Sequence, residues 1–182
     1  MQLQDKYRIA VLSAYALALH GIESLVPTPI PWLRLGLANI VTLVALVLYG
    51  FRTAMTVTLI RVILASLFTG TFLGPSFVLS VGGGVTSTAA MGLTFLVFRD
   101  VFGPVGLSLV GAFFHNTAQL TLAYFLFIQR MEAMFVIGPI IVLLGTLTGV
   151  ANGAVSGLLL KNLLKKEGGR IQNDNKDERR AR

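Results

Sequence analysis

Long apolar stretches, separated by short breaks rich in proline, glycine or arginine, fill most of this 182-residue chain. Hydrocarbon offers no partner for a bare peptide group, so a chain that crosses a membrane closes its backbone hydrogen bonds within helices. About 20 apolar residues suffice for one crossing. We therefore predict an all-α integral membrane protein with about six transmembrane helices. Their approximate ranges are Arg8–Val26, Leu35–Tyr49, Thr53–Phe68, Ser76–Phe98, Val105–Ile128 and Met134–Leu160.

The second and third stretches are short, and only a brief break at Phe51-Arg52 separates them. A re-entrant hairpin over these two stretches is therefore an alternative to two full spans. The composition indicates a membrane protein in either case, with 54% hydrophobic and 13% charged residues. A soluble domain carries roughly 25% charged residues. Too little polar surface remains here to cover a water-soluble globule.

Basic residues near the ends of the predicted spans gather on one side of the membrane. That side holds Lys6, Arg8, Arg52, Arg99, Lys161, Lys165 and Lys166, whereas the other holds Arg34 and Arg130. Short loops rich in Lys and Arg stay in the cytoplasm. We therefore expect a multi-pass protein of the cell (inner) membrane with both termini in the cytoplasm.

The C-terminal segment differs in composition from the rest of the chain. Residues 161–182 contain eight Lys or Arg and four acidic residues, which accounts for most of the net charge of +7. From Gly168 onward the chain is polar and lacks aromatic residues, which is typical of disorder. We predict a transmembrane domain over residues 1–167 and a charged, disordered cytoplasmic tail over residues 168–182. The tail would lie near anionic lipid rather than nucleic acid, because no aromatic residue interleaves its charges.

Several kinds of chemistry lack the residues they need. The chain has no cysteine, which excludes disulfides and thiolate catalysis. The acids before the tail are isolated, so no aspartate-rich cluster can hold Mg²⁺ on a diphosphate. No nucleotide-binding loop is present. We therefore expect neither an enzyme nor a bound cofactor. We also expect no metal site, because the chain has two histidines and no acid accompanies His115. The acids concerned are Asp5, Glu23, Asp100 and Glu132.

Ionisable side chains within apolar spans are costly and point to function or to buried pairs. His20 and Glu23 lie one turn apart at the outer end of the first span. They indicate either an outward-opening polar pocket or a Glu23–Arg34 pair that fastens the first outer loop. Arg61 lies in the middle of the third span and needs a partner: Glu23, helix-end carbonyls or an anionic ligand.

The fifth span carries a second polar group, with His115, Asn116 and Gln119 at helical spacing. Such residues either bond neighbouring helices or line a pocket. Asn39 and Asn152 are further polar residues within spans, and the glycine run in the fourth span permits close packing or exposes backbone to a substrate. The candidate ligand-binding residues are His20, Glu23, Arg34, Asn39, Arg61, Gly82, Gly83, His115, Asn116 and Gln119.

Two spans carry stripes of small residues four positions apart, which suit close helix packing. The last span has Gly145, Gly149, Gly153 and Gly157. The first span has Ala10, Ala14 and Ala18, which form a candidate docking surface for another span or for a partner protein.

Four segments together resemble the Gx transporter family, which is often labelled "heptaprenyl diphosphate synthase component I" and is similar to the substrate-binding S components of energy-coupling factor (ECF) transporters. The resemblance covers about residues 5–165. The segments are Pro31-Trp-Leu-Arg34-Leu-Gly-Leu-Ala-Asn39-Ile, Arg61, Leu79-Ser-Val-Gly-Gly83 and Gly111-Ala-Phe-Phe-His115-Asn116-x-x-Gln119.

This resemblance implies six helices and a substrate held near the outer face by the first outer loop and the outer parts of the last three spans. It also implies that Ala10-x-x-x-Ala14 docks a membrane coupling subunit powered by two ATPases. The synthase label conflicts with the missing aspartate clusters.

The main hypothesis is therefore an S-component-like subunit that captures a small molecule at the outer face for ATP-driven uptake with an ECF module. Arg34, Arg61, His20 and His115 make the candidate site basic, which favours an anionic ligand such as a carboxylate or phosphate. The alternatives are an accessory membrane subunit of isoprenoid or quinone (heptaprenyl diphosphate) biosynthesis and a self-sufficient carrier.

Overall fold

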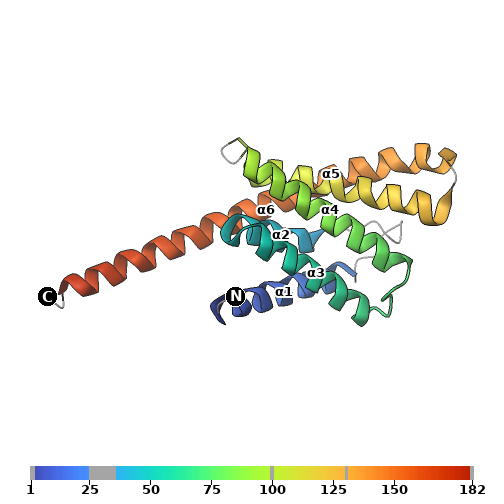
Figure 1. Ribbon diagram of the computed structural model, residues 1–182. Helices are drawn as coiled ribbons and strands as arrows, with labels where there is room; N and C mark the ends of the chain where they lie inside the picture. Colours follow the sequence, from blue (N-terminus) through green and yellow to red (C-terminus); the bar gives the residue numbers. More distant parts are fainter. Residues whose placement is uncertain (1–2, 25–35, 99–100, 130, 181–182) are drawn as a thin grey trace.

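The computed structural model describes residues 3–24, 36–98, 101–129 and 131–180, and in these ranges the protein is built from helices (Figure 1). This arrangement confirms the predicted all-α fold, and six α-helices lie in the described residues. They are α1 (Leu3–Ser24), α2 (Leu37–Tyr49), α3 (Phe51–Phe68), α4 (Pro75–Val97), α5 (Pro104–Ala123) and α6 (Met131–Arg180), and a π-helical turn, η1 (Tyr124–Ile128), continues α5.

The helices form two groups of three. Helices α1, α2 and α3 pack against one another, while α5 lies between α4 and α6 (Figure 1). Contacts of α3 with α4 and of α2 with α6 join the groups. The apolar core lies where they meet, with Leu43 and Leu46 of α2 against Met91 of α4 and Leu107 of α5.

Helix α2 is the centre of the bundle and contacts all five other helices. Its buried residues run without a break from Ile40 to Leu46, as expected of a helix that is apolar on every side. It has 13 residues, or roughly 20 Å at 1.5 Å per residue. A length below the ~30 Å of the hydrocarbon layer is accommodated here by burial among longer helices.

A single glycine separates α2 from α3. Gly50 has φ 84° and ψ 175°, a conformation that residues with a side chain rarely adopt. Its amide donates to the carbonyl of Leu46 and so ends α2. The two short stretches of the sequence are thus two separate helices that pack against each other.

Three of the described helices contain segments long and apolar enough to cross a membrane: Phe51–Phe68, Pro75–Val97 and Phe135–Lys165. Helix α2 is a shorter apolar helix. The sequence predicts about six spans, and the difference has a physical reason. Helix α1 contains Asp5, Lys6 and Arg8 as well as His20 and Glu23, and α5 contains His115 with two amide side chains, so polar residues interrupt the apolar stretch of both helices. His20, Glu23 and these polar side chains of α5 line the pocket described below.

Helix α6 is longer than the predicted last span. It continues to Arg180, and its C-terminal part projects beyond the other helices (Figure 1). It therefore includes residues 168–180, for which the sequence predicts disorder. The division into a domain of residues 1–167 and a tail of residues 168–182 stays a prediction, as does the cytoplasmic position of both termini.

Candidate functional site

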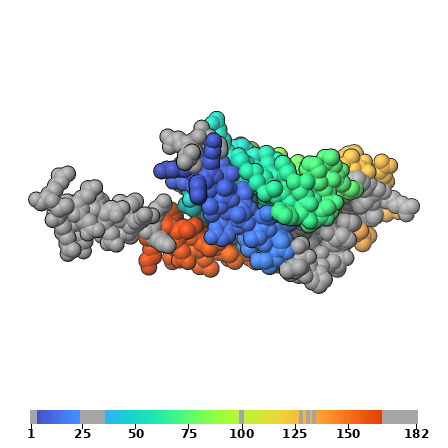
Figure 2. All heavy atoms as spheres, turned by 90° about the horizontal axis from the view of Figure 1, so that it is seen from below, coloured from blue at the N-terminus to red at the C-terminus, as the bar shows by residue number. Residues whose placement is uncertain are grey.

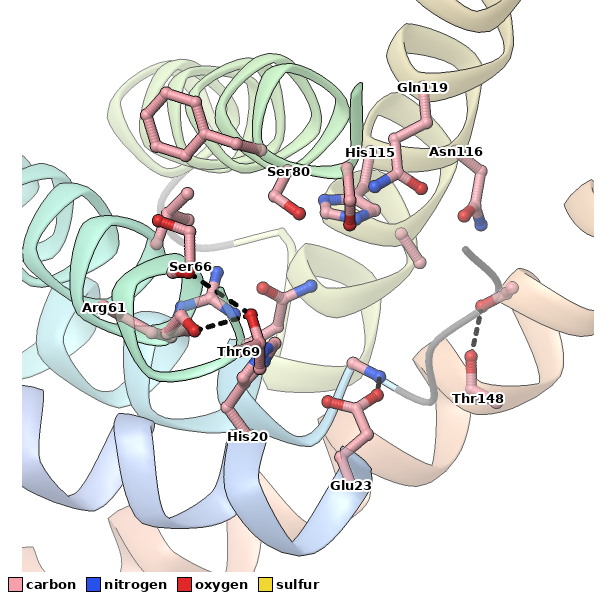
Figure 3. A pocket seen from close by; sticks show the side chains of 18 of the residues that line it. His20, Glu23, Arg61, Ser66, Thr69, Ser80, His115, Asn116, Gln119 and Thr148 are labelled. Atoms are coloured by element: carbon pink, nitrogen blue, oxygen red, sulfur yellow. Dashed lines mark hydrogen bonds between the residues drawn. The ribbon is translucent and has the colours of Figure 1, made fainter. Parts of the chain in front are cut away.

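All six helices contribute to one polar pocket (Figure 3). The pocket is open to solvent, and the space within it, counted together with that opening, is about 760 Å³. Fourteen of its twenty lining residues carry polar side chains. These are His20, Glu23, Asn39, Arg61, Ser66, Thr69, Thr71, Ser76, Ser80, His115, Asn116, Gln119, Thr148 and Asn152; the others are Gly36, Val62, Ala65, Phe77, Ala112 and Gly145.

The pocket lies towards one end of the bundle because successive helices run in alternating directions. It takes residues from the last turns of α1, the first turn of α2 and the second half of α3. Two residues, Thr69 and Thr71, come from the connection between α3 and α4. From the other group the pocket takes the first turns of α4, the middle and second half of α5 and the first half of α6. The N-terminus lies at the opposite end of α1. The basic residues of the sequence predict that the pocket end faces outward, and this orientation stays a prediction.

On the side of the pocket formed by α1 and α2, the carboxylate of Glu23 links the two helices. His20 and Glu23 are both buried, and the backbone amide of Gly36 donates a hydrogen bond to Oε1 of Glu23. Gly36 has φ 74°, a left-handed conformation that favours glycine. A Cβ at this position would lie 3.3 Å from the amide nitrogen of Asn152 and 3.5 Å from that of Asn39. Glu23 therefore holds the start of α2 against the end of α1, next to two amide side chains.

Arg61 projects from α3 and is 7% exposed. One turn earlier, the hydroxyl of Thr58 lies 3.2 Å from the hydroxyl of Thr42 on α2 and 3.0 Å from that of Thr88 on α4. These bonds hold α3 between its two neighbours. A Cβ at Gly84 of α4 would lie 3.8 Å from Nη2 of Arg61, so the guanidinium lies close to a part of α4 that has no side chain.

The opposite wall joins α4, α5 and α6. Nε2 of Gln119 donates a hydrogen bond of 3.4 Å to the carbonyl of Leu79. The imidazole of His115 lies over Gly83, where a Cβ would come within 2.9 Å of its Cε1. Asn116 lies against α6, because a Cβ at Gly145 would overlap its amide nitrogen. Glycines on both neighbours thus allow the polar face of α5 to sit at the helix junctions.

Seven of the ten residues predicted to bind ligand line this pocket. Arg34 lies outside the described residues. Gly82 and Gly83 are not among the lining residues, because Leu122 lies over Gly82 and the side chains of His115 and Gln119 lie over Gly83. The seven residues are His20, Glu23, Asn39, Arg61, His115, Asn116 and Gln119, and their role in binding stays a prediction.

Other lining residues were not assigned to the site from the sequence. Six of these carry hydroxyl groups, and a single serine or threonine in an apolar helix often bonds a carbonyl of its own helix, as Thr148 does with Gly145. Asn152 could have been assigned to the site from the sequence, because it is a polar amide within the apolar last span. The six hydroxyl residues are Ser66, Thr69, Thr71, Ser76, Ser80 and Thr148.

The predicted docking surface lies on the outside of the bundle. Ala10, Ala14 and Ala18 are exposed on α1, and α1 lies at the surface in the space-filling view (blue in Figure 2). The opposite face of α1 is buried and includes Ser13 and Ala16. Within the described residues, no three His, Cys, Asp or Glu side chains form a group that could hold a metal ion.

Comparisons with known proteins give two matches. Residues 12–159 match a family described as heptaprenyl diphosphate synthase component I. The fold matches a solved structure titled "Structure and mechanism of the S component of a bacterial ECF transporter", with a TM-score of 0.62 and 18% sequence identity. The match covers 94% of this chain and 99% of that chain. No curated protein matches the sequence.

Proposed function

This chain belongs to the heptaprenyl diphosphate synthase component I family, and from its S-component-like fold and its pocket we propose that it is a substrate-binding membrane subunit. It captures a small molecule and delivers it across the membrane with an energy-coupling module. We assign it no prenyl-transfer activity, because the isolated acids of the sequence supply no diphosphate–metal site.

The observation that carries this proposal is the concentration of polar side chains within an apolar bundle. Buried polar groups without compensating hydrogen bonds are costly, more so in a membrane protein than at a water-exposed surface. A pocket lined by fourteen polar residues from six helices is therefore expected to have a hydrophilic occupant.

Arg61 supports an acidic group on that ligand. A guanidinium keeps its charge under all physiological conditions, and its fork of donors matches a carboxylate or phosphate. Arg61 is buried in the middle of α3, where an acidic group on the ligand would be favourable in addition to the contacts that the guanidinium already makes. A small molecule with a carboxylate or phosphate would place that group at Arg61.

The exposed face of α1 supports a partner subunit. Ala10, Ala14 and Ala18 leave a shallow surface on which a second helix can approach closely. Neighbouring large apolar side chains, Tyr7, Val11 and Tyr15, are also exposed. We propose that an ECF-type coupling subunit docks here and links the chain to ATPases.

Native mass spectrometry of the purified chain tests capture directly. We expect a small molecule to be retained by the wild-type protein and to be lost from Arg61→Gln. Arg52→Gln is the matched control, since Arg52 is an exposed residue at the start of the same helix. Equal retention by both variants would contradict a role of Arg61 in binding, and no retained molecule in any preparation would contradict capture itself.

The family description favours one other function, that of an accessory membrane subunit of isoprenoid biosynthesis. Purification of the chain with its natural partners separates the two. A coupling protein with ATPases supports the capture subunit, and a soluble prenyl synthase supports the accessory subunit. Uptake by the chain alone in liposomes without ATP would indicate a self-sufficient carrier.

A further inference from the structure

The charges that line the pocket point to a ligand with two opposite charges, and we propose that the site takes a small hydrophilic zwitterion of the amino-acid type. This inference rests on the proposed function. It names the class of substrate that the capture subunit would bind.

Among its described lining residues the pocket contains one arginine and one glutamate, which carry opposite charges when both are ionised. Arg61 supplies the cation and Glu23 the carboxylate, and both are more than nine-tenths buried. They come from different helices, and in Figure 3 His20 is drawn between them. With neutral histidines, this part of the site has no net charge.

A zwitterion would place an opposite charge beside each of these two side chains, in addition to the contacts that they already make. A ligand with only an acidic group would be attracted by Arg61 and repelled by Glu23, whereas a ligand with only an amine would meet the opposite problem. One Glu23 oxygen accepts the Gly36 amide. An ionised carboxylate has about four acceptor sites on two oxygens, so Glu23 has capacity to accept from an ammonium group as well.

The remainder of the pocket favours a hydrophilic body between the two charged groups. Most ligand pockets are lined mainly by apolar side chains, but here the apolar lining is limited to Val62, Ala65, Phe77 and Ala112. Hydroxyl and amide side chains from α3 to α6 supply both donors and acceptors. A long prenyl chain would leave these donors and acceptors without partners, whereas a short polar side chain would find several.

Binding measurements with probes that each lack one of the two charged groups test this class of ligand. The full chain in lipid nanodiscs is titrated with the twenty common amino acids, with their N-acetyl derivatives and with their methyl esters. The N-acetyl forms lack the ammonium group, and the esters lack the carboxylate. We expect at least one amino acid to bind, and both of its derivatives to bind at least tenfold more weakly.

A substitution at Glu23 tests whether this side chain contacts the ammonium group of the ligand. Glu23→Gln keeps an oxygen that can accept the Gly36 amide but removes the charge. We expect this variant to bind the amino acid at least tenfold more weakly, with unchanged affinity for the N-acetyl form. Asp5→Asn is the matched control, because it removes the same charge from the other end of α1, and it is expected to leave both affinities unchanged.

The possible outcomes separate this inference from the proposed function. An N-acetyl form that binds as tightly as its parent, or no binding by any amino acid, overturns the zwitterion. If mass spectrometry still finds a retained molecule that is lost from Arg61→Gln, the capture function stands. A uniform loss of binding to all probes in Glu23→Gln would show that Glu23 acts on the fold of the pocket, and would also overturn its assignment to the ammonium group.

Discussion

Gly153 lies at the closest approach of α6 to α5, and replacing it with alanine should separate the two helices. A Cβ there would lie 2.6 Å from Cα of Val105, 2.9 Å from Cβ of Ser108 and 3.1 Å from the carbonyl oxygen of Pro104. Two of these atoms belong to the backbone and cannot rotate away. Overpacking of this kind lowers the free energy of unfolding by about 1–3 kcal/mol. Because two of the contacts are with backbone atoms, we take the upper value of about 3 kcal/mol for Gly153→Ala.

Alanine also gains about 1 kcal/mol over glycine in a helix, so the net loss is about 2 kcal/mol. For a protein of this size, each kcal/mol shifts Tm by about 2–4 °C, so we expect Tm to fall by about 4–8 °C. Gly157→Ala is the control from the same glycine stripe. A Cβ there would make only an ordinary contact, 3.7 Å from Pro104, so its Tm should rise slightly. Thermal unfolding in one detergent compares them, and a Tm of Gly153→Ala equal to or above that of Gly157→Ala would refute the packing argument.

Two further stability predictions follow from the same helices. Thr58→Val removes the hydroxyl that lies 3.2 Å from the hydroxyl of Thr42 and 3.0 Å from that of Thr88. Each hydrogen bond between membrane helices contributes about 0.6 kcal/mol, so thermal unfolding should show a Tm lower by about 2–5 °C. Thr56→Val is the control and should differ little from wild type, because the Thr56 hydroxyl bonds a carbonyl of its own helix at the surface. Gly50→Ala forces a side chain into φ 84° at a cost of about 1–3 kcal/mol, so its Tm should fall as well, and an unchanged Tm would contradict the strain assigned to this turn.

The periodicity and punctuation of the sequence predict the helices well. The ends of α3 and α4 lie within two residues of the predicted ends, and three of these four ends are marked in the sequence: Gly50 precedes α3, Gly70 follows it, and Pro75 begins α4. Helix α1 begins five residues before the predicted span, since a helix can extend past the apolar stretch into polar residues. The same reason applies to α6, which continues far beyond Leu160. Hydropathy marks the part of a helix that prefers lipid, not the part that is helical.

The candidate site is less predictable than the helices. Ionisable residues such as Glu23 and Arg61 stand out within apolar stretches, and both line the pocket. Hydroxyl residues do not stand out, because the sequence does not show whether a threonine such as Thr69 faces lipid, its own helix or a cavity. Gly83 was predicted to bind ligand but does not line the pocket. A glycine run indicates close approach, but only the packed structure shows that side chains of α5 occupy the space.

Helix α1 connects the pocket to the proposed docking surface. Its buried face carries His20 and Glu23 into the pocket, while its exposed face presents Ala14 and Ala18. Glu23 also holds the start of α2 through the amide of Gly36. A ligand bound at the Glu23 carboxylate would therefore contact the same helix on which we propose that the partner subunit docks.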